Sequence, residues 1–133
     1  IYYSLEQYAL AFEAFSIAEK SAASLDLNIP YIHYNLGLCE SARGELDGAK
    51  VHFALALKLE PELAPAWAAL GTLVCADGDF DRAVDLAYRA VELSPDNPSF
   101  WMALAQIYDA KGDGATAEEM RRQAFSIELP PAD

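Results

Sequence analysis

The stretch YNLGLCESARG, residues 34–44, returns as AALGTLVCADG at 68–78 and as MALAQIYDAKG at 102–112. Each recurrence lies 34 residues after the one before it. Further residues outside this stretch keep the same step, and a fixed period of this length is typical of repeat proteins. The residues that recur are Leu36/Leu70/Leu104, Gly37/Gly71, Gly44/Gly78/Gly112, Ala49/Ala83/Ala117, Ala56/Ala90/Ala124, Pro61/Pro95 and Trp67/Trp101.

Within one repeat the apolar residues follow a helical period on both sides of a glycine. Ile32, Leu36 and Cys39 form one stripe before Gly44. A second stripe follows the glycine and comprises Leu46, Ala49, Phe53, Ala56 and Leu57. This pattern predicts a helix, a tight turn and a second helix.

The residues around the turn agree with this prediction. Glycine at 44, 78 and 112 can adopt positive φ and end the first helix. Asp79 and Asp113 directly follow two of these glycines, so we expect their carboxylates to accept hydrogen bonds from the N–H groups that open the second helix. Pro61 and Pro95 end the second helix, because proline lacks the N–H and clashes with the preceding turn. The recurring alanines are small, as the close approach of two packed helices requires.

The repeats resemble tetratricopeptide repeats, whose pattern runs W-x2-L-G-x2-Y, A-x3-F and P over 34 residues. The resemblance implies an all-α fold, a right-handed α-solenoid of stacked antiparallel helix pairs. The departures are mild: His33 replaces the Trp, Ala105 the Gly, and Ala87 and Arg121 the Phe, and the last proline has moved to Pro130. The residues that match are Trp67, Leu70, Gly71, Ala83, Ala90 and Pro95, then Trp101, Leu104, Tyr108, Ala117 and Ala124, and in the first full repeat Leu36, Gly37, Ala49, Phe53, Ala56 and Pro61.

We therefore expect one array with repeats at 30–63, 64–97 and 98–131, preceded by an incomplete repeat and connector at 1–29. Tyr8, Ala11, Phe15 and Ala18 have the spacing of a second helix in that incomplete repeat. The helix over 115–128 carries Arg121 where the earlier second helices have Phe53 and Ala87. With its polar neighbours it is expected to cap the array, because a terminal repeat must show water a polar outer face.

Composition excludes several classes of function. Nine Lys and Arg against 21 Asp and Glu give a net charge of −12, which disfavours nucleic acid and anionic membranes as partners. No apolar run approaches the roughly 20 residues that cross a bilayer, so we expect a soluble protein, with the cytoplasm slightly favoured. Two cysteines are too few for a disulfide framework and predict two free thiols.

No catalytic, metal-binding or cofactor motif is found, so we expect neither an enzyme nor a cofactor. His33 takes the position of Trp67 and Trp101, and His52 that of Leu86 and Met120. Both histidines are therefore predicted to be partly buried packing residues. Cys39 is predicted to be a core residue, and Cys75 to lie on another face, with nothing nearby to lower its pKa. The remaining acidic residues are interpreted as a solvated charged surface.

Binding is the predicted activity. In tetratricopeptide arrays peptide ligands usually lie on an exposed stripe of the first helices, and the resemblance implies the same groove here. The groove residues are Tyr31, Tyr34, Asn35, Leu38, Ser41, Ala68, Thr72, Cys75, Ser99, Met102, Gln106 and Asp109. Co-chaperones of the family bind carboxylates there with Lys and Arg, which this stripe lacks, so that function is rejected.

The groove suits an amphipathic helix or an extended segment with apolar anchors, and one basic residue for Asp109. Three alternatives stay open. In the first, Tyr31, Tyr34 and Leu38 pack against the preceding helix and do not bind a ligand. In the second, the array associates with a second copy of itself as a homodimer. In the third, the array recruits substrate for a catalytic domain elsewhere in a longer protein.

Overall fold

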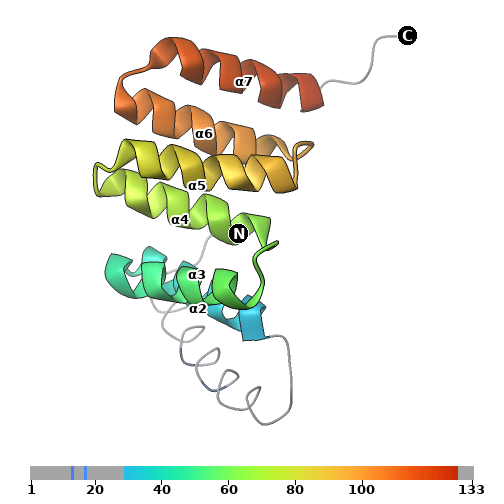
Figure 1. Cartoon of the computed structure of the whole chain (residues 1–133). Coiled ribbons are helices and arrows are strands. Elements are labelled where there is room, and N and C mark those ends of the chain that lie inside the picture. Colours follow the sequence, from blue (N-terminus) through green and yellow to red (C-terminus); the bar gives the residue numbers. More distant parts are fainter. Residues whose placement is uncertain (1–12, 14–16, 18–28, 129–133) are drawn as a thin grey trace. The chain divides into compact units, whose positions relative to one another are not determined.

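The computed structural model describes residues 13, 17 and 29–128 of the 133-residue chain. These residues form six helices and no strand (Figure 1), which confirms the all-α prediction. The expected helix around Tyr8–Ala18 lies outside the described residues, apart from positions 13 and 17. The helices are α2 (Ile29–Ala42), α3 (Leu46–Leu59), α4 (Ala64–Ala76), α5 (Phe80–Leu93), α6 (Pro98–Lys111) and α7 (Gly114–Glu128).

The chain divides into two compact units, Ile1–Pro61 and Glu62–Asp133. In the first unit α2 packs against α3 as a hairpin. In the second unit α4 pairs with α5 and α6 pairs with α7, while α6 also packs against α5 and α4. Each predicted helix–turn–helix is thus a hairpin in which the two helices cover each other's apolar stripes.

The turns follow the glycine pattern. Gly44, Gly78 and Gly112 have φ values of 80°, 86° and 94°, in the left-handed region that favours glycine. The acidic residues after them behave differently from one another. Asp113 accepts hydrogen bonds from the N–H of Thr116 at 3.2 Å and from its hydroxyl at 2.7 Å. Asp79 makes no side-chain bond to the start of α5, so its predicted capping role is wrong.

The recurring small residues lie at the centre of each hairpin. Ala49, Ala83 and Ala117 are fully buried, and so are Ala56, Ala90 and Ala124 to within 2%. Cys39, Leu73 and Ile107 are buried as predicted for a shared core position. Both cysteines are free thiols, as expected. The alanines allow the close helix approach because a larger side chain would hold the two backbones apart.

The two glycines of the repeated stretch are in close contact with the facing helix. A Cβ on Gly37 would lie 2.7 Å from Cε1 of Phe53, whereas a Cβ on Gly71 would lie 3.1 Å from the backbone of Ala83 and Ala87. The first hairpin therefore uses the missing Cβ to admit an aromatic ring, and the second uses it to bring two backbones together.

No helix within the described ranges is long and apolar enough to span a membrane.

Candidate functional site

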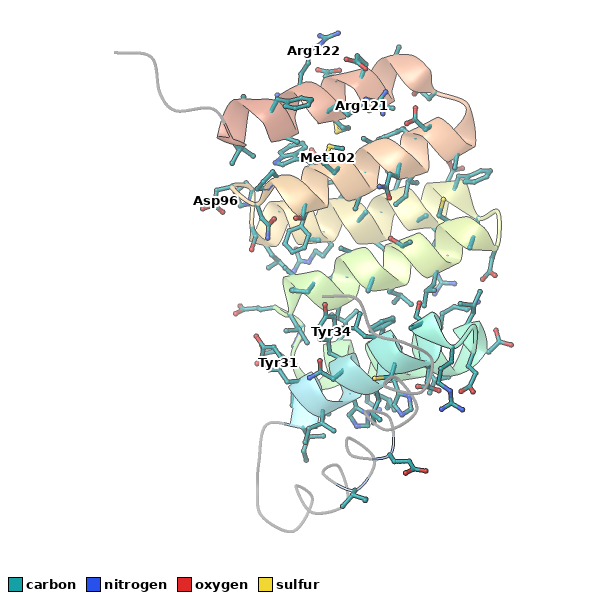
Figure 2. The ribbon with its side chains drawn as sticks, turned by 180° about the vertical axis from the view of Figure 1, so that it is seen from behind. Tyr31, Tyr34, Asp96, Met102, Arg121 and Arg122 are labelled. Atoms are coloured by element: carbon teal, nitrogen blue, oxygen red, sulfur yellow. The ribbon has the colours of Figure 1, made fainter. Side chains whose placement is uncertain are left out.

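The part of the predicted groove that lies on α2 is an aromatic and aliphatic surface, which we call the tyrosine face (Tyr31, Tyr34 and Leu38). Tyr31 is 51% exposed and Leu38 is 39% exposed. Tyr34, labelled with Tyr31 in Figure 2, is half-buried. The centroid of its ring lies 5.8 Å from that of Phe53. Burial, and to a smaller extent Tyr31, raises the pKa of Tyr34, so its phenol remains neutral. Asn35 and Ser41 lie beside this face, half-buried.

The rest of the predicted groove lies in the second unit, on two helices that pack against each other; we call it the α4–α6 face. Four of its residues are exposed: Thr72, Ser99, Gln106 and Asp109. Ala68, Cys75 and Met102 are half-buried. The hydroxyl of Thr72 donates to the carbonyl of Ala68 at 3.1 Å, so its proton is already used within α4. Most side chains of this face are small or polar, whereas those of the tyrosine face are aromatic or aliphatic.

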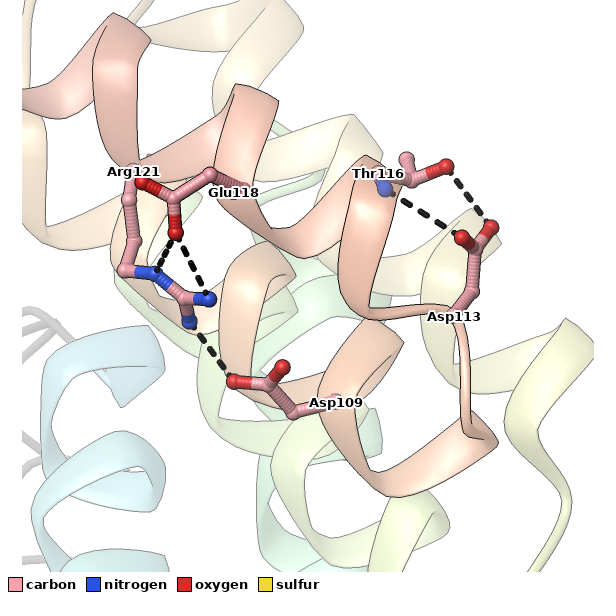
Figure 3. A network of polar contacts seen from close by, with 5 residues as sticks. All are labelled: Asp109, Asp113, Thr116, Glu118 and Arg121. Atoms are coloured by element: carbon pink, nitrogen blue, oxygen red, sulfur yellow. Dashed lines mark hydrogen bonds and ion pairs between the residues drawn. The ribbon is translucent and has the colours of Figure 1, made fainter.

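Asp109 is already paired within the chain. Nη1 of Arg121 lies 2.7 Å from Oδ2 of Asp109, and the same guanidinium donates to Glu118 at 3.2 Å (Figure 3). A basic residue from a partner would have to displace Arg121 before it reached Asp109. Asp109 is therefore a poor anchor for a basic ligand.

Three titratable side chains of the first hairpin form a cluster that was not predicted from the sequence. The rings of His33 and His52 stack with centroids 5.4 Å apart, and Nδ1 of His52 pairs with Oε1 of Glu40. Glu40 is only 6% exposed. The second carboxylate oxygen of Glu40 occupies the space that a Cβ on Gly48 would fill. His33 is buried and His52 is half-buried, which agrees with their prediction as partly buried packing residues.

A signal for Glu40 was present in the sequence. One and two repeats later its position is taken by Val74 and Tyr108, which are apolar or aromatic. An acidic residue at a position that the other repeats keep apolar is buried, and a buried carboxylate needs a partner. In this hairpin His52 is that partner.

Two kinds of reactive site were possible among the described residues: an activated cysteine thiol and a metal-binding cluster. Burial raises the pKa of the Cys75 thiol, and burial is also the main cause of the raised pKa of Cys39, so neither thiol is activated as a nucleophile. Within the described ranges no three His, Cys, Asp or Glu residues are arranged to hold a metal ion. One exposed aromatic residue of α7, Phe125, was not singled out from the sequence, although it is 57% exposed.

Comparison with known proteins agrees with this architecture. The family model of the cilia and flagella-associated protein 70 middle TPR-like domain matches residues 10–128. No curated protein sequence matches the chain significantly.

Several solved structures share the fold at low sequence identity. BtubC from P. vanneervenii superposes with a TM-score of 0.78 at 22% identity, over 96% of this chain and 61% of its own. A MamA structure gives 0.76 at 20% identity, over 96% and 71%. YrrB, a TPR protein with an unusual peptide-binding site, gives 0.75 at 20% identity, over 92% and 61%.

Proposed function

The chain belongs to the family of the cilia and flagella-associated protein 70 middle TPR-like domain, and from this premise we propose that it is a non-catalytic protein-interaction module. It binds an apolar segment of a partner protein on the first helices of its hairpins. The family's name refers to cilia and flagella, so ciliary and flagellar proteins are the first partners to test.

The observation that carries the proposal is the exposure of the tyrosine face. Tyr31 and Leu38 stand seven residues apart on α2, on the same side of the helix, and both leave a large part of their apolar surface in water. Aromatic residues at such positions are frequent anchors in protein interfaces, because they bury a large area with few rotatable bonds.

The chemistry of the partner follows from what the predicted groove residues lack. None of them is Lys or Arg, so a carboxylate-rich ligand gains no cation there. Asp109, the one acidic residue among them, is paired with Arg121. An apolar helix or extended segment is the ligand class that remains. That YrrB carries a peptide-binding site supports peptide binding as an activity this fold can perform.

The partner is first found by affinity capture and mass spectrometry, and a synthetic peptide spanning its binding segment is then titrated against purified chain. Tyr31→Ala and Leu38→Ala are each expected to weaken the peptide's binding about tenfold, the loss typical of an interface anchor. Tyr88→Ala is the matched control, since Tyr88 is 46% exposed but lies on the second helix α5. Because apolar contacts are not screened by ions, binding is expected to persist at high salt.

Equal affinity of the wild type and the Tyr31→Ala, Leu38→Ala double variant would exclude the tyrosine face. A dimer that light scattering detects without peptide, and that the double variant abolishes, would show instead that the face binds a second copy. Tyr34 is not used in this test, because its packing against Phe53 would make a binding defect hard to separate from a folding defect.

A further inference from the structure

Helix α7 exposes a row of residues that helix α5 buries. With the 34-residue step, Ala87 and Val91 of α5 correspond to Arg121 and Phe125 of α7. Ala87 is fully buried and Val91 is 3% exposed. Phe125, at the same position as Val91, is 57% exposed, and the side chain of Arg121 is 29% exposed.

The cause of the difference is the helix that follows. The hairpins α4–α5 and α6–α7 are built alike, because Ala83 and Ala90 of α5 and their counterparts Ala117 and Ala124 of α7 are all buried. Helix α6 packs against α5, so α5 has a second neighbouring helix in addition to its own partner α4. Among the described residues no helix follows α7, which has only α6 beside it in the second unit (Figure 1).

The exposure of Phe125 does not fit the predicted capping role of α7. Polar residues do occupy much of the outer surface of α7, with Glu118, Glu119 and Gln123 exposed. A capping helix needs only such residues, whereas an exposed phenylalanine costs solvation free energy unless something covers it. Its counterpart Val91 is buried on α5, the helix against which the next helix, α6, packs.

Two arginines lie beside Phe125 on α7, and they differ in how their charge is used. The Arg121 guanidinium is taken by Asp109 and Glu118. Arg122 extends away from the ribbon of α7 (Figure 2) and forms no ion pair with any described residue. On a chain of net charge −12, an exposed arginine beside an exposed aromatic residue favours a partner that combines apolar and acidic residues.

We propose that this surface, Arg122 and Phe125 with the stem of Arg121, docks an amphipathic helix of a partner protein in the place that α6 occupies on α5. The partner helix carries an apolar ridge that covers Phe125 and carboxylates on its flank that pair with Arg122. It continues an interface that the chain already makes once, between α5 and α6. A second copy of the chain is disfavoured as the occupant, because two chains that each carry a net charge of −12 repel each other.

This inference does not depend on the tyrosine face. It concerns the second helix of a hairpin, whereas the surfaces in the proposed function belong to first helices. The two have different variants and different probes, so either one can fail while the other holds.

The test uses a peptide of defined sequence as the probe. The first probe is a synthetic peptide of residues 97–111 with blocked ends, which contains α6, the helix that packs against α5. The second probe is the same peptide with A103E and Q106E, which adds carboxylates beside the apolar ridge. Both are titrated against the isotope-labelled chain by NMR, so that affinity and the residues that respond are read together.

We expect the shifts to centre on α7 and the acidic probe to bind more tightly than the first. Phe125→Ser is expected to weaken both probes tenfold or more. Arg122→Glu is expected to remove the advantage of the acidic probe and to leave the first probe nearly unchanged. Tyr88→Ser serves as the control for loss of an exposed aromatic residue, and Tyr31→Ala as the control for the tyrosine face; neither should alter binding.

Since Phe125 is largely exposed, Phe125→Ser should leave the melting temperature close to that of the wild type. Unchanged affinity of both probes for this variant would overturn the proposal, and so would shifts that centre on the α4–α6 face. A homodimer that forms without peptide and that Phe125→Ser dissolves would also overturn it, because a second copy would then be the occupant.

Discussion

The hairpins α2–α3 and α4–α5 share a backbone plan but fill it with different side chains. In the first, Gly37 faces the ring of Phe53, which is 1% exposed. In the second, Gly71 faces the backbone of α5 at the position of Ala87. The comparison shows that the glycine has two uses in one repeat pattern. It admits a large residue, or it brings two helices closer, depending on what stands across from it.

The same two hairpins also differ at three further positions, which are polar in the first hairpin and apolar or aromatic in the second. His33, Glu40 and His52 of the first occupy the positions of Trp67, Val74 and Leu86 in the second. A stacked pair of rings and a hydrogen-bonded histidine–glutamate pair replace apolar contacts. Polar contacts of this kind are directional, so removal of one member leaves the others unsatisfied, whereas an apolar core loses only contact area.

The largest effect is expected from Phe53→Ala. This variant gives the first hairpin the alanine that the second has at the same position, Ala87, but leaves the spacing of α2 and α3 unchanged. The cavity beside Gly37 cannot collapse, because the helix spacing is set by the buried alanines. We expect a loss of about 3–5 kcal/mol in the free energy of unfolding, measured by urea denaturation. A loss below 1 kcal/mol would mean that α2 and α3 can close up like α4 and α5.

The polar cluster gives the next largest effect. His52→Leu leaves the carboxylate of Glu40 buried without its partner and is expected to cost about 2 kcal/mol of unfolding free energy. The triple variant His33→Trp, Glu40→Val, His52→Leu copies the second hairpin and should recover most of that loss, since a buried polar pair can be replaced as a whole by well-packed apolar residues. If the triple variant is less stable than His52→Leu alone, the two cores are not interchangeable.

Substitution of the glycines distinguishes their two uses. Gly37→Ala should cost about 1–2 kcal/mol, because the new Cβ overlaps the Phe53 ring. The cost should largely vanish in a Phe53→Leu background, which shortens the side chain. Gly71→Ala meets backbone atoms instead, and no neighbouring side-chain change should rescue it. Denaturation of the single and double variants measures this coupling, and equal coupling in both hairpins would contradict the distinction.

The smallest effect concerns the helix starts. Asp113→Ala should lower the melting temperature, whereas Asp79→Ala should not, because only Asp113 bonds to the helix that it precedes. Hydrogen bonds from Thr116 lower the pKa of the Asp113 carboxyl below its ordinary 3.8. The cap therefore stabilises fully above pH 3.8 and loses this contribution as the pH falls through the lower folded value.

Thermal unfolding of wild type and Asp113→Ala from pH 7 down to about pH 2 checks this sign. The difference in melting temperature should be constant near neutral pH and disappear in acid. A difference that instead grew as the pH fell would mean that the protonated carboxyl is the better cap.

Much of the core was predictable because one pattern is written three times. The burial of His33, Cys39 and the alanine series follows from comparing each position with its counterparts 34 residues away. The same comparison points to Glu40, which replaces apolar residues at its position. Asp79 shows the limit: it has the right type and place for a cap, but its side chain does not reach the helix N–H groups.

The candidate surfaces were predictable in part. The helical spacing of Tyr31 and Leu38 correctly placed two exposed apolar residues on one side of α2. The ion pair between Asp109 and Arg121, the contact of Tyr34 with Phe53 and the exposure of Phe125 were not read from the sequence. Each of these depends on which residue of another helix stands opposite, and spacing along one helix carries no such information.

The sequence by itself determined the order of helix, glycine turn and helix in each repeat, and most of the positions that face inward, because these depend on backbone preferences and on periodicity along the chain. Only the tertiary structure decided which side chains pair, that Glu40 is held by His52 and Asp109 by Arg121, and that Phe125 stays in water while Val91 does not. The physical reason is that pairing and exposure depend on distances between separate helices, and those distances arise only when the helices pack.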